Sequence, residues 1–385
     1  MTAIKPGTVG ILPAGALGVA FFFHLTAELS RVDGRVFFVQ RTRSVSGSSL
    51  RSDGALRLAT RDGVTSLTNP AIWHADLPGC FEEGLLPEVL LICTQPDQIL
   101  HVLNSCVRLL ERAQQDGTDL VEQLPLLVLC SNGIYFQRVR QFFIEKLEEA
   151  TLMGRLPDLW PAAMPRLIAR LLRGVTIQTG QREGSGPTAV YHPGPRGRTR
   201  IAGGEQKHQA QCAHLLSSLG GWFEVGGSAS PTRVEFDKAL VNLAANLLGQ
   251  LYAIDDRGRF RSMTIREILD RGQSHEFQEL AGHVVEVGRA VRAYGADEPL
   301  DPLLEAMFAS CREHLDHIPS SLQWIDQQLR AGRLQPRLTP TETWLLEPLI
   351  RYAHAAGLEK AARYFETLMR RVEHRLALAV SARLR

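Results

Sequence analysis

The chain has 385 residues, of which 44% are hydrophobic and 22% charged, and its formal net charge is +2. This length favours two domains, with ample apolar sequence for a buried core. The near-neutral charge gives no electrostatic basis for binding nucleic acid or an acidic membrane surface.

The cysteines and the apolar runs narrow the class of protein further. The six cysteines are scattered, and none stands in a C-x-x-C pattern or at a metal-ligand spacing from a histidine. We therefore expect reduced core thiols, a cytoplasmic protein and no metal site. No apolar run reaches the roughly 18 residues that span a bilayer, so we expect no membrane partner.

Residues 9–25 read VGILPAGALGVAFFFHL, an apolar strand, a group of small residues and an apolar helix. Lys5 followed by this apolar stretch also resembles the start of a secretory signal peptide. However, no A-x-A cleavage site follows, and the strand-like run at residues 35–39 comes at once. That run would complete a β-α-β unit, so we interpret the stretch as strand, turn and helix.

The first half of the chain alternates strand-like and helix-like segments, which predicts an α/β domain with a parallel sheet covered on both faces. Strands are predicted at residues 8–12, 35–39, 89–94 and 126–131, and a hairpin around Asp62-Gly63 at 54–67. The flexible composition of residues 226–230 (GGSAS) marks a boundary. We therefore predict a Rossmann-like domain at residues 1–228, with a helical insertion at about 138–173, and an all-helical domain at 229–385.

The helical prediction for the second domain rests on apolar residues that recur every three or four positions. This spacing is found at residues 233–254, 276–295, 300–315, 320–332 and 339–357.

The turn at residues 13–18 keeps two of the three glycines of a G-x-G-x-x-G dinucleotide-binding turn. The second glycine would let the backbone approach a pyrophosphate, and the third would let the helix pack tightly on the strand. A proline occupies the first position; it can begin a turn but removes an N–H. The alternative is a strand–helix turn without a ligand. The candidate cofactor-binding residues here are Pro13, Ala14, Gly15, Ala16, Leu17 and Gly18.

The end of the second predicted strand indicates which cofactor would bind. NAD sites usually place Asp or Glu there to bind the ribose hydroxyls, whereas NADP sites place Arg near the 2′-phosphate. Here Arg41 and Arg43 follow the strand, and no carboxylate does. Arg41 lies close to the position where the ribose-binding or phosphate-binding residue is expected. We therefore predict NADP, with Arg41 as a phosphate ligand. Two solvated surface arginines are the alternative.

The segment FDKALVNLAANLLGQL at residues 236–251 is apolar around most of its helical circumference, so this helix should be largely buried. Lys238, Asn242 and Asn246 are nevertheless spaced four residues apart and would share one face. Burying an unpaired amide costs about 1–3 kcal/mol. The stripe therefore predicts a wet cleft, a ligand or a polar network; an ordinary solvent-facing stripe is the alternative.

Taken in chain order, PAGALG, SNG at residues 131–133 and KALVNLAAN at 238–246 resemble the ketopantoate reductase (2-dehydropantoate 2-reductase) family. The segments at residues 283–297, 319–333 and 340–357 are similar to further helices of that family. The resemblance covers most of the chain. It implies a Rossmann-like domain followed by a helical domain like the C-terminal domain of 6-phosphogluconate dehydrogenase.

The resemblance also implies roles for individual residues. Lys238 would be the general acid that protonates a 2-oxo group, with Glu342 placed to orient it or to stabilise the hydroxyl side. It implies NADP as cofactor, a small 2-oxo acid as substrate and a homodimer as a candidate assembly. The implied substrate ligands are Asn242, Asn246, Ser320 and Ser321, and the implied further cofactor ligands are Thr94, Gln95 and Asn132.

Several of these residues also have a purely structural interpretation. Asn132-Gly133 is a common turn dipeptide, Ser320 and Ser321 would cap a helix, and residues 339–342 (TPTE) fit a capping box. Two residues depart from the family pattern. Pro13 stands where the family has a glycine, and Gln95 stands where it has a lysine. The alternative functions are therefore an opine-type or 3-hydroxyacid dehydrogenase, or a nucleotide-binding homologue without activity.

Overall fold

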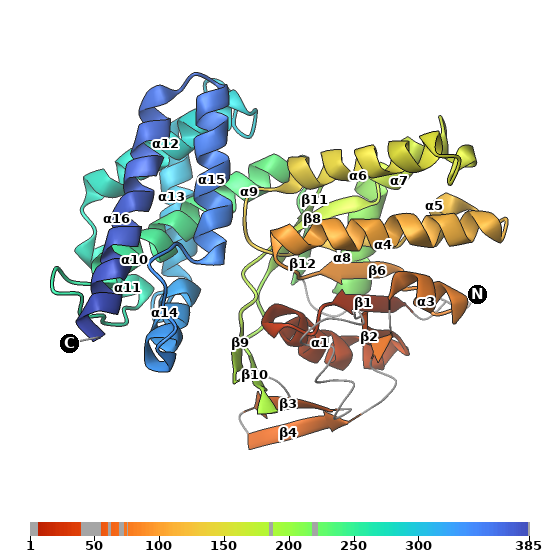
Figure 1. The fold of residues 1–385 in the computed structure, drawn as a ribbon, viewed down its shortest axis with the longest axis horizontal. Helices are drawn as coiled ribbons and strands as arrows, with labels where there is room; N and C mark the ends of the chain where they lie inside the picture. The colour runs from red at the N-terminus through yellow and green to blue at the C-terminus, as the bar shows by residue number, and fades with distance from the viewer. Residues whose placement is uncertain are drawn as a thin grey trace. The chain divides into compact units, whose positions relative to one another are not determined.

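The computed structural model describes residues 7–39, 55–60, 63–68, 73–74, 76–184, 188–217 and 222–383 (Figure 1). Arg41, Arg43 and Asp62 lie outside these residues. The chain forms two compact units. The first comprises Met1–Ser131 and Phe136–Pro231, and the second comprises Asn132–Tyr135 and Thr232–Arg385. A short segment from the first half of the sequence thus belongs to the second unit.

The first unit is built on a sheet with the strand order β12-β11-β8-β7-β6-β1-β2-β5. All neighbouring strands are parallel except β8 and β11. From β5 to β8 the order is that of doubly wound dinucleotide-binding folds. The predicted parallel sheet is therefore confirmed. The strands are β1 (Thr8–Leu12), β2 (Arg35–Val39), β5 (Trp73–His74), β6 (Val89–Ile92), β7 (Leu126–Leu129), β8 (Leu171–Thr176), β11 (Thr199–Ala202) and β12 (Phe223–Val225).

Helices cover both faces of this sheet because its central strands are apolar on both sides. Every residue of β6 and β7 is buried. Val89, Leu91 and Val128 pack in one cluster with residues of α1 (Ala16–Leu29) and α8 (Gln206–Leu216). On the opposite face, α4 (Pro96–Gln115) packs against α6 (Phe136–Leu152) (Figure 1). Shorter helices of this unit are Ser30–Val32, α3 (Leu77–Glu82), α5 (Leu120–Gln123), Pro157–Leu159 and α7 (Ala163–Ile168).

The predicted insertion at residues 138–173 is wrong in most of its length. β7 and β8 are parallel neighbours, and parallel strands need a crossover connection, which is usually a helix. α6 is that crossover. Only the part after α6, with the single turn at Pro157–Leu159 and α7, extends the connection beyond one helix.

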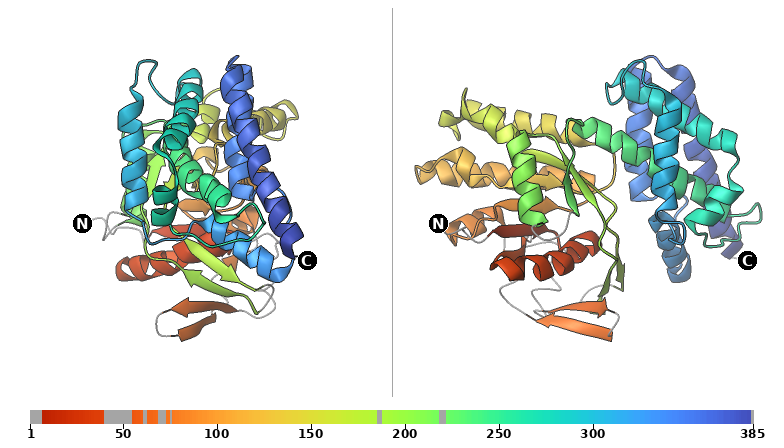
Figure 2. Two further views of the ribbon diagram at one scale, coloured as in Figure 1. Left: turned by 90° about the vertical axis from the view of Figure 1, so that its left-hand side faces the viewer. Right: turned by 180° about the vertical axis from the view of Figure 1, so that it is seen from behind.

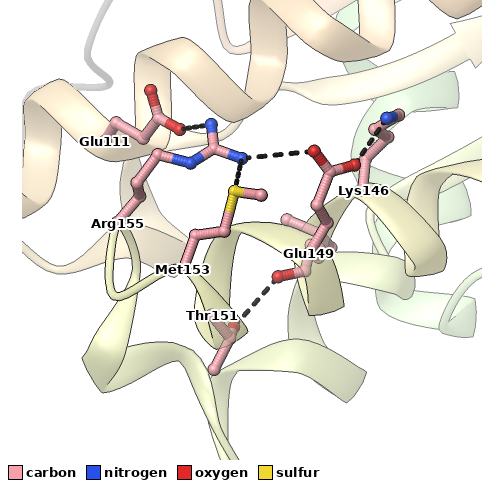
Figure 3. A network of polar contacts seen from close by, with 7 residues as sticks. Glu111, Lys146, Glu149, Thr151, Met153 and Arg155 are labelled. Carbon is pink, nitrogen blue, oxygen red and sulfur yellow. Dashed lines mark hydrogen bonds and ion pairs between the residues drawn. The ribbon is translucent and has the colours of Figure 1, made fainter.

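Charged side chains attach the end of this crossover to its neighbour (Figure 3). Arg155, just after α6, pairs with Glu111 of α4 and, at 3.7 Å, with Glu149 of α6. Glu149 also pairs with Lys146. Arg155, Glu149 and Lys146 are all partly exposed to water, so each pair adds little to stability, and the network mainly sets the path of the chain.

A smaller sheet with the order β4-β3-β10-β9 lies against α1 (Figures 1 and 2). Its strands are β3 (Ala55–Thr60), β4 (Gly63–Thr68), β9 (Gly180–Glu183) and β10 (Val190–Pro193). The antiparallel pairing of β3 with β4 confirms the predicted hairpin. The Tyr191 hydroxyl donates to the Ala14 carbonyl at 3.1 Å, and His24 Nε2 lies 2.9 Å from the Gly194 carbonyl oxygen. These contacts attach the smaller sheet to the turn before α1 and to the middle of the helix.

The described part of the second unit is helical, as predicted. Its core gathers buried side chains from all its long helices, among them Phe236, Phe277 and Phe365. The run through α9, a π-helical segment and α10 contributes many of the fully buried residues. The helices are α9 (Pro231–Asn242), the π segment (Leu243–Leu247), α10 (Leu248–Ala253), α11 (Ile265–Arg271), α12 (Ser274–Ala290), α13 (Leu300–Arg312), α14 (Ser320–Ala331), α15 (Pro340–Ala355) and α16 (Glu359–Arg383).

Two further expectations can be compared with these elements. The cysteines at positions 80, 93, 106, 130, 212 and 311 are free thiols, and all but Cys93 are buried. Among the described residues, no helix combines the length and the apolar character needed to cross a membrane.

Replacing Gly18 by alanine should strongly destabilise the first unit. A Cβ at Gly18 would lie 2.1 Å from the Pro13 carbonyl oxygen, whereas a Cβ at Gly15 would meet only Pro13 Cγ at 3.7 Å. We expect Gly18→Ala to lower the free energy of unfolding by about 2–4 kcal/mol and Gly15→Ala by less than about 1 kcal/mol. Urea denaturation measures both. Equal losses in the two variants would contradict the close packing of α1 on this turn.

Candidate functional site

The turn between β1 and α1 exposes backbone donors. α1 begins at Ala16 after the N-cap residue Gly15, and no side chain caps it. The first N–H groups of a helix have no partner inside the helix, and they favour an anion. Gly18 lets the helix lie directly on the Pro13 carbonyl. Ala14 is buried and held by Tyr191, so the turn is fixed on both sides.

The sheet order reverses between β1 and β6, which is where doubly wound folds bind ligands, at the carboxyl ends of the strands. The Cys93 N–H donates to the Leu12 carbonyl at 2.6 Å, which brings the ends of β6 and β1 together. Thr94 follows, buried, and its hydroxyl has no hydrogen-bond partner among the described residues. Gln95 is exposed as the N-cap of α4 and makes no capping hydrogen bond. The unpartnered Thr94 hydroxyl and the uncapped start of α4 thus lie together at the carboxyl end of β6.

Asn132 lies with the second unit. The next residue, Gly133, has φ of +127°, and a Cβ there would lie 2.9 Å from Trp344 Cβ, so only glycine fits without strain. The Ile134 N–H donates to the Trp344 carbonyl at 2.9 Å, and the Tyr135 N–H donates to Glu235 Oε1 at 3.2 Å. Because Trp344 is on α15 and Glu235 on α9, the partly buried Asn132 is held beside these two helices.

The polar stripe of α9 is buried rather than solvent-facing. Asn242 is 5% and Asn246 7% exposed, and Lys238 is partly buried. The alternative of a solvated face is therefore wrong for both asparagines. Asn242 Nδ2 has no hydrogen-bond partner, and Lys238 makes neither a hydrogen bond nor an ion pair, among the residues that the structure describes. Unsatisfied buried donors of this kind need a ligand or water to offset their desolvation.

The helix that carries the stripe is not a uniform α-helix, contrary to our expectation. Residues Leu243–Leu247 form a π-helical segment, and the Leu248 N–H donates to the Leu243 carbonyl. A π segment widens the turn and is often found at functional sites. It shifts Asn246 out of the strict four-residue register with Lys238 and Asn242.

Ser321 binds this irregular segment. Its hydroxyl donates to the Asn246 carbonyl at 3.4 Å, and Ser321 itself is buried. Ser320 is exposed at the first position of α14. The N-cap of α14 is Pro319, and no side chain caps the helix, so the structural alternative in which the serines are caps is wrong.

Glu342 lies in the first turn of α15 and is fully buried. The predicted capping box is absent, because the Thr339 side chain makes no capping bond and neither carboxylate oxygen of Glu342 has a hydrogen-bond partner in the described chain. Gln250 is also fully buried, and both polar atoms of its side chain lack a partner. Sequence reasoning missed Gln250, although it repeats the spacing of four residues after Asn246.

Burial shifts the protonation of the two charged groups toward neutrality. It lowers the pKa of Lys238 to about 8, with a small opposing effect from Cys311. Burial also raises the pKa of Glu342 to about 8; its own backbone N–H and the Gln250 amide are near enough to oppose this shift weakly, although neither makes a hydrogen bond of good geometry to the carboxylate. The pKa of His317 is lowered by burial and then by the nearby His314 and Lys238.

The two charged groups have different neighbours. Cys311 and His317 lie near enough to Lys238 for its charge to act on them, whereas the Gln250 amide lies near Glu342. The contact in which Glu342 would orient Lys238 is thus not found between these described residues. Nor do the described residues place three or more His, Cys, Asp or Glu where they could hold a metal ion.

A parallel doubly wound sheet with an uncapped turn at its switch point is typical of dinucleotide-binding folds. Solved structures share the whole fold. A ketopantoate reductase of the PanE/ApbA family from Ralstonia eutropha JMP134 superposes with a TM-score of 0.56 at 17% identity, covering 96% of this chain and 99% of its own. The 2-dehydropantoate 2-reductase of Porphyromonas gingivalis W83 gives 0.58 at 14% identity, covering 95% and 99%.

A third similar structure carries a different name. D-mandelate dehydrogenase in complex with NADH superposes with a TM-score of 0.59 at 15% identity, covering 96% of this chain and 99% of its own. No protein-family model and no curated protein matches the sequence. The predicted resemblance to ketopantoate reductases is thus confirmed for the fold.

The contribution of Glu342 to stability should fall as the pH rises toward 8. The pKa of Glu342 is raised in the folded chain from 4.5 to about 8, so the folded state holds a proton that the unfolded state releases. The stabilisation is therefore complete below about pH 4.5 and is lost by about pH 8, at up to about 1.4 kcal/mol per pH unit. Chemical denaturation between pH 5.5 and 8 measures this slope.

Glu342→Gln should remove most of that pH dependence because its amide does not titrate. Glu347→Gln provides the matched control, since Glu347 is an exposed carboxylate on the same helix. If both variants keep the slope of the unmodified protein, Glu342 is not buried as a neutral acid.

Proposed function

We propose that this protein is an NADPH-dependent reductase of a small 2-oxo acid, with 2-dehydropantoate as the first candidate substrate. One observation carries the proposal: Lys238 is a partly buried lysine without an ion partner, on the helix run that also buries Asn242, Asn246 and Gln250. In this proposal the first unit is the cofactor-binding domain and the second unit holds the substrate. The fold shared with 2-dehydropantoate 2-reductases supports this assignment.

The first unit fits a dinucleotide through its turn and its switch point. The N–H groups of Ala16 and Leu17 would bind the pyrophosphate, and the Thr94 hydroxyl would bind the cofactor beside them. Pro13 contributes no N–H, so the turn offers one donor fewer than a glycine would. Arg41 would bind the 2′-phosphate, because strand β2 is followed by arginines and not by a carboxylate.

In the reaction, bound NADPH supplies the hydride. Lys238 donates a proton to the carbonyl oxygen as negative charge develops there, and its ammonium stabilises that charge. With a pKa of about 8, Lys238 is protonated at pH 7 and yet releases its proton more readily than an exposed lysine would. This is the range in which a general acid works best at neutral pH.

The other residues of the second unit would hold the substrate. The Asn242 amide is a donor without a partner, and Asn132 and Asn246 add amides on neighbouring elements. At the uncapped start of α14, the exposed Ser320 hydroxyl and the backbone N–H groups of Ser320 and Ser321 would bind the substrate carboxylate. Glu342, neutral at pH 7, would donate a hydrogen bond without repelling that carboxylate.

A reductase for a different 2-oxo acid is the second candidate. Gln95 stands where the ketopantoate reductase pattern has a lysine, which removes one positive charge that would bind an anionic group. The structural similarity to D-mandelate dehydrogenase favours the same alternative. A panel of 2-oxo acids, followed by nicotinamide absorbance, distinguishes the two candidates by relative kcat/KM.

Replacing Lys238 by alanine should lower kcat by about 10²- to 10⁴-fold, the usual contribution of a positioned general acid. The affinity for NADPH should stay within about twofold in this proposal, because Lys238 belongs to the substrate unit. Lys360→Ala is the matched control, since Lys360 is an exposed lysine of the second unit. Steady-state kinetics and NADPH fluorescence titration measure the two quantities.

The same kinetics should show activity that declines above about pH 8, where Lys238 loses its proton. Turnover by Lys238→Ala at the unmodified rate would exclude Lys238 as the acid. NADPH binding without turnover of any 2-oxo acid in the unmodified protein would instead favour a homologue without activity.

Replacing Arg41 by alanine should weaken NADPH binding by about tenfold or more and leave NADH binding nearly unchanged, because only NADPH carries the 2′-phosphate. Fluorescence titration with both cofactors measures this difference. Arg35→Ala, at the start of β2 where the chain enters the sheet, is the control. An equal effect of Arg41→Ala on both cofactors would show that Arg41 does not read the 2′-phosphate.

A further inference from the structure

The second unit contains a cavity of about 520 Å³ that the proposed reaction does not use. It lies where α16 passes α10 and α11, and its volume is in the range of small-molecule sites. Most of its polar lining is basic. The polar residues that line it are Tyr252, Asp256, Arg271, Arg371, His374 and Arg375.

Two of these arginines lack a partner. Arg271 and Arg371 make neither a hydrogen bond nor an ion pair with any described residue. Arg375 pairs with Asp256, whose side chain is almost fully exposed to water. The Tyr252 hydroxyl is committed to Glu276 of α12, to which it donates at 2.6 Å. The lining therefore holds an excess of positive charge.

The helix geometry concentrates this charge on one side. Arg371 and Arg375 are four residues apart on α16, with His374 between them, so their side chains share a face. Arg271 adds a guanidinium from the last turn of α11. Burial and the hydrogen bond to Glu276 raise the pKa of Tyr252, and the charge of the nearby Arg371 opposes this rise. Gathered like charges repel each other, and an anion between them would offset that repulsion.

We propose that this cavity binds a small organic phosphate. Guanidinium groups match phosphate oxygens with parallel N–H donors, and two unpaired arginines balance a group of two or more negative charges. Leu251 and Leu378 line the same cavity and provide apolar surface for the organic part. The proposal does not depend on the reductase activity.

The test is calorimetric titration of the full chain with inorganic pyrophosphate at low salt, in the presence and absence of saturating NADPH. We expect binding in both conditions, with an affinity that falls as salt is added. Arg271→Ser and Arg371→Ser should each weaken it by about tenfold or more. Arg363→Ser is the matched control, because Arg363 is exposed on α16 outside the cavity.

Several results would overturn the proposal. Pyrophosphate that fails to bind at millimolar concentration would exclude the site. Binding that NADPH abolishes, and that Arg371→Ser leaves unchanged, would place the phosphate at the turn before α1 instead. Citrate binding as tightly as pyrophosphate would exclude specificity for phosphate. Thermal unfolding without ligand should be unchanged in both serine variants, since Arg271 and Arg371 are exposed.

Discussion

The organisation of the second unit depends on polar side chains buried in an otherwise apolar helix run and at the start of α15. Asn242, Gln250 and Glu342 are buried, and each has at least one polar atom without a partner in the described structure. Each such group costs about 1–3 kcal/mol. A chain that only needed a stable core would carry leucine or alanine there. The cost is understandable if a ligand supplies the missing hydrogen bonds, and this makes the run the centre of the candidate site.

The π segment lies among these buried polar groups. A regular α-helix uses each internal carbonyl within the helix, but the Asn246 carbonyl accepts a bond from Ser321. The wider turn thus adds a link between this helix and α14, and it reorients Asn246 relative to Lys238. The residues LAANL at positions 243–247 do not predict such a segment, because alanine and leucine are good α-helix formers. The preference for the π form comes from packing against other helices, which the sequence does not display.

Most of the fold could be predicted because its signals are local. The apolar strands at residues 89–92 and 126–129 are buried on both faces, and that composition alone indicates a parallel sheet. The prediction of an insertion is wrong for α6, because the sequence alone does not show that β8 lies parallel to β7 and that α6 connects them. The alternative in which Ser320 and Thr339 cap their helices also fails, because Pro319 occupies the N-cap position of α14 and the Thr339 side chain makes no capping hydrogen bond. Gln250 continues the same four-residue spacing after Asn246, but glutamine at that spacing does not by itself indicate a function.

The charge state of the second unit at neutral pH decides what it can bind. With both pKa values near 8, Lys238 is mostly cationic and Glu342 mostly neutral at pH 7. An ionised Glu342 would repel an anionic 2-oxo acid. A neutral Glu342 would not, and it would not offset the positive charge of the Lys238 ammonium. In the proposed reaction, burial of Glu342 would thus favour binding of the anionic substrate, although it is a cost to stability. A small increase in the solvation of Glu342 would favour its ionised form, so in that proposal the packing of α15 around this residue would help to set substrate affinity.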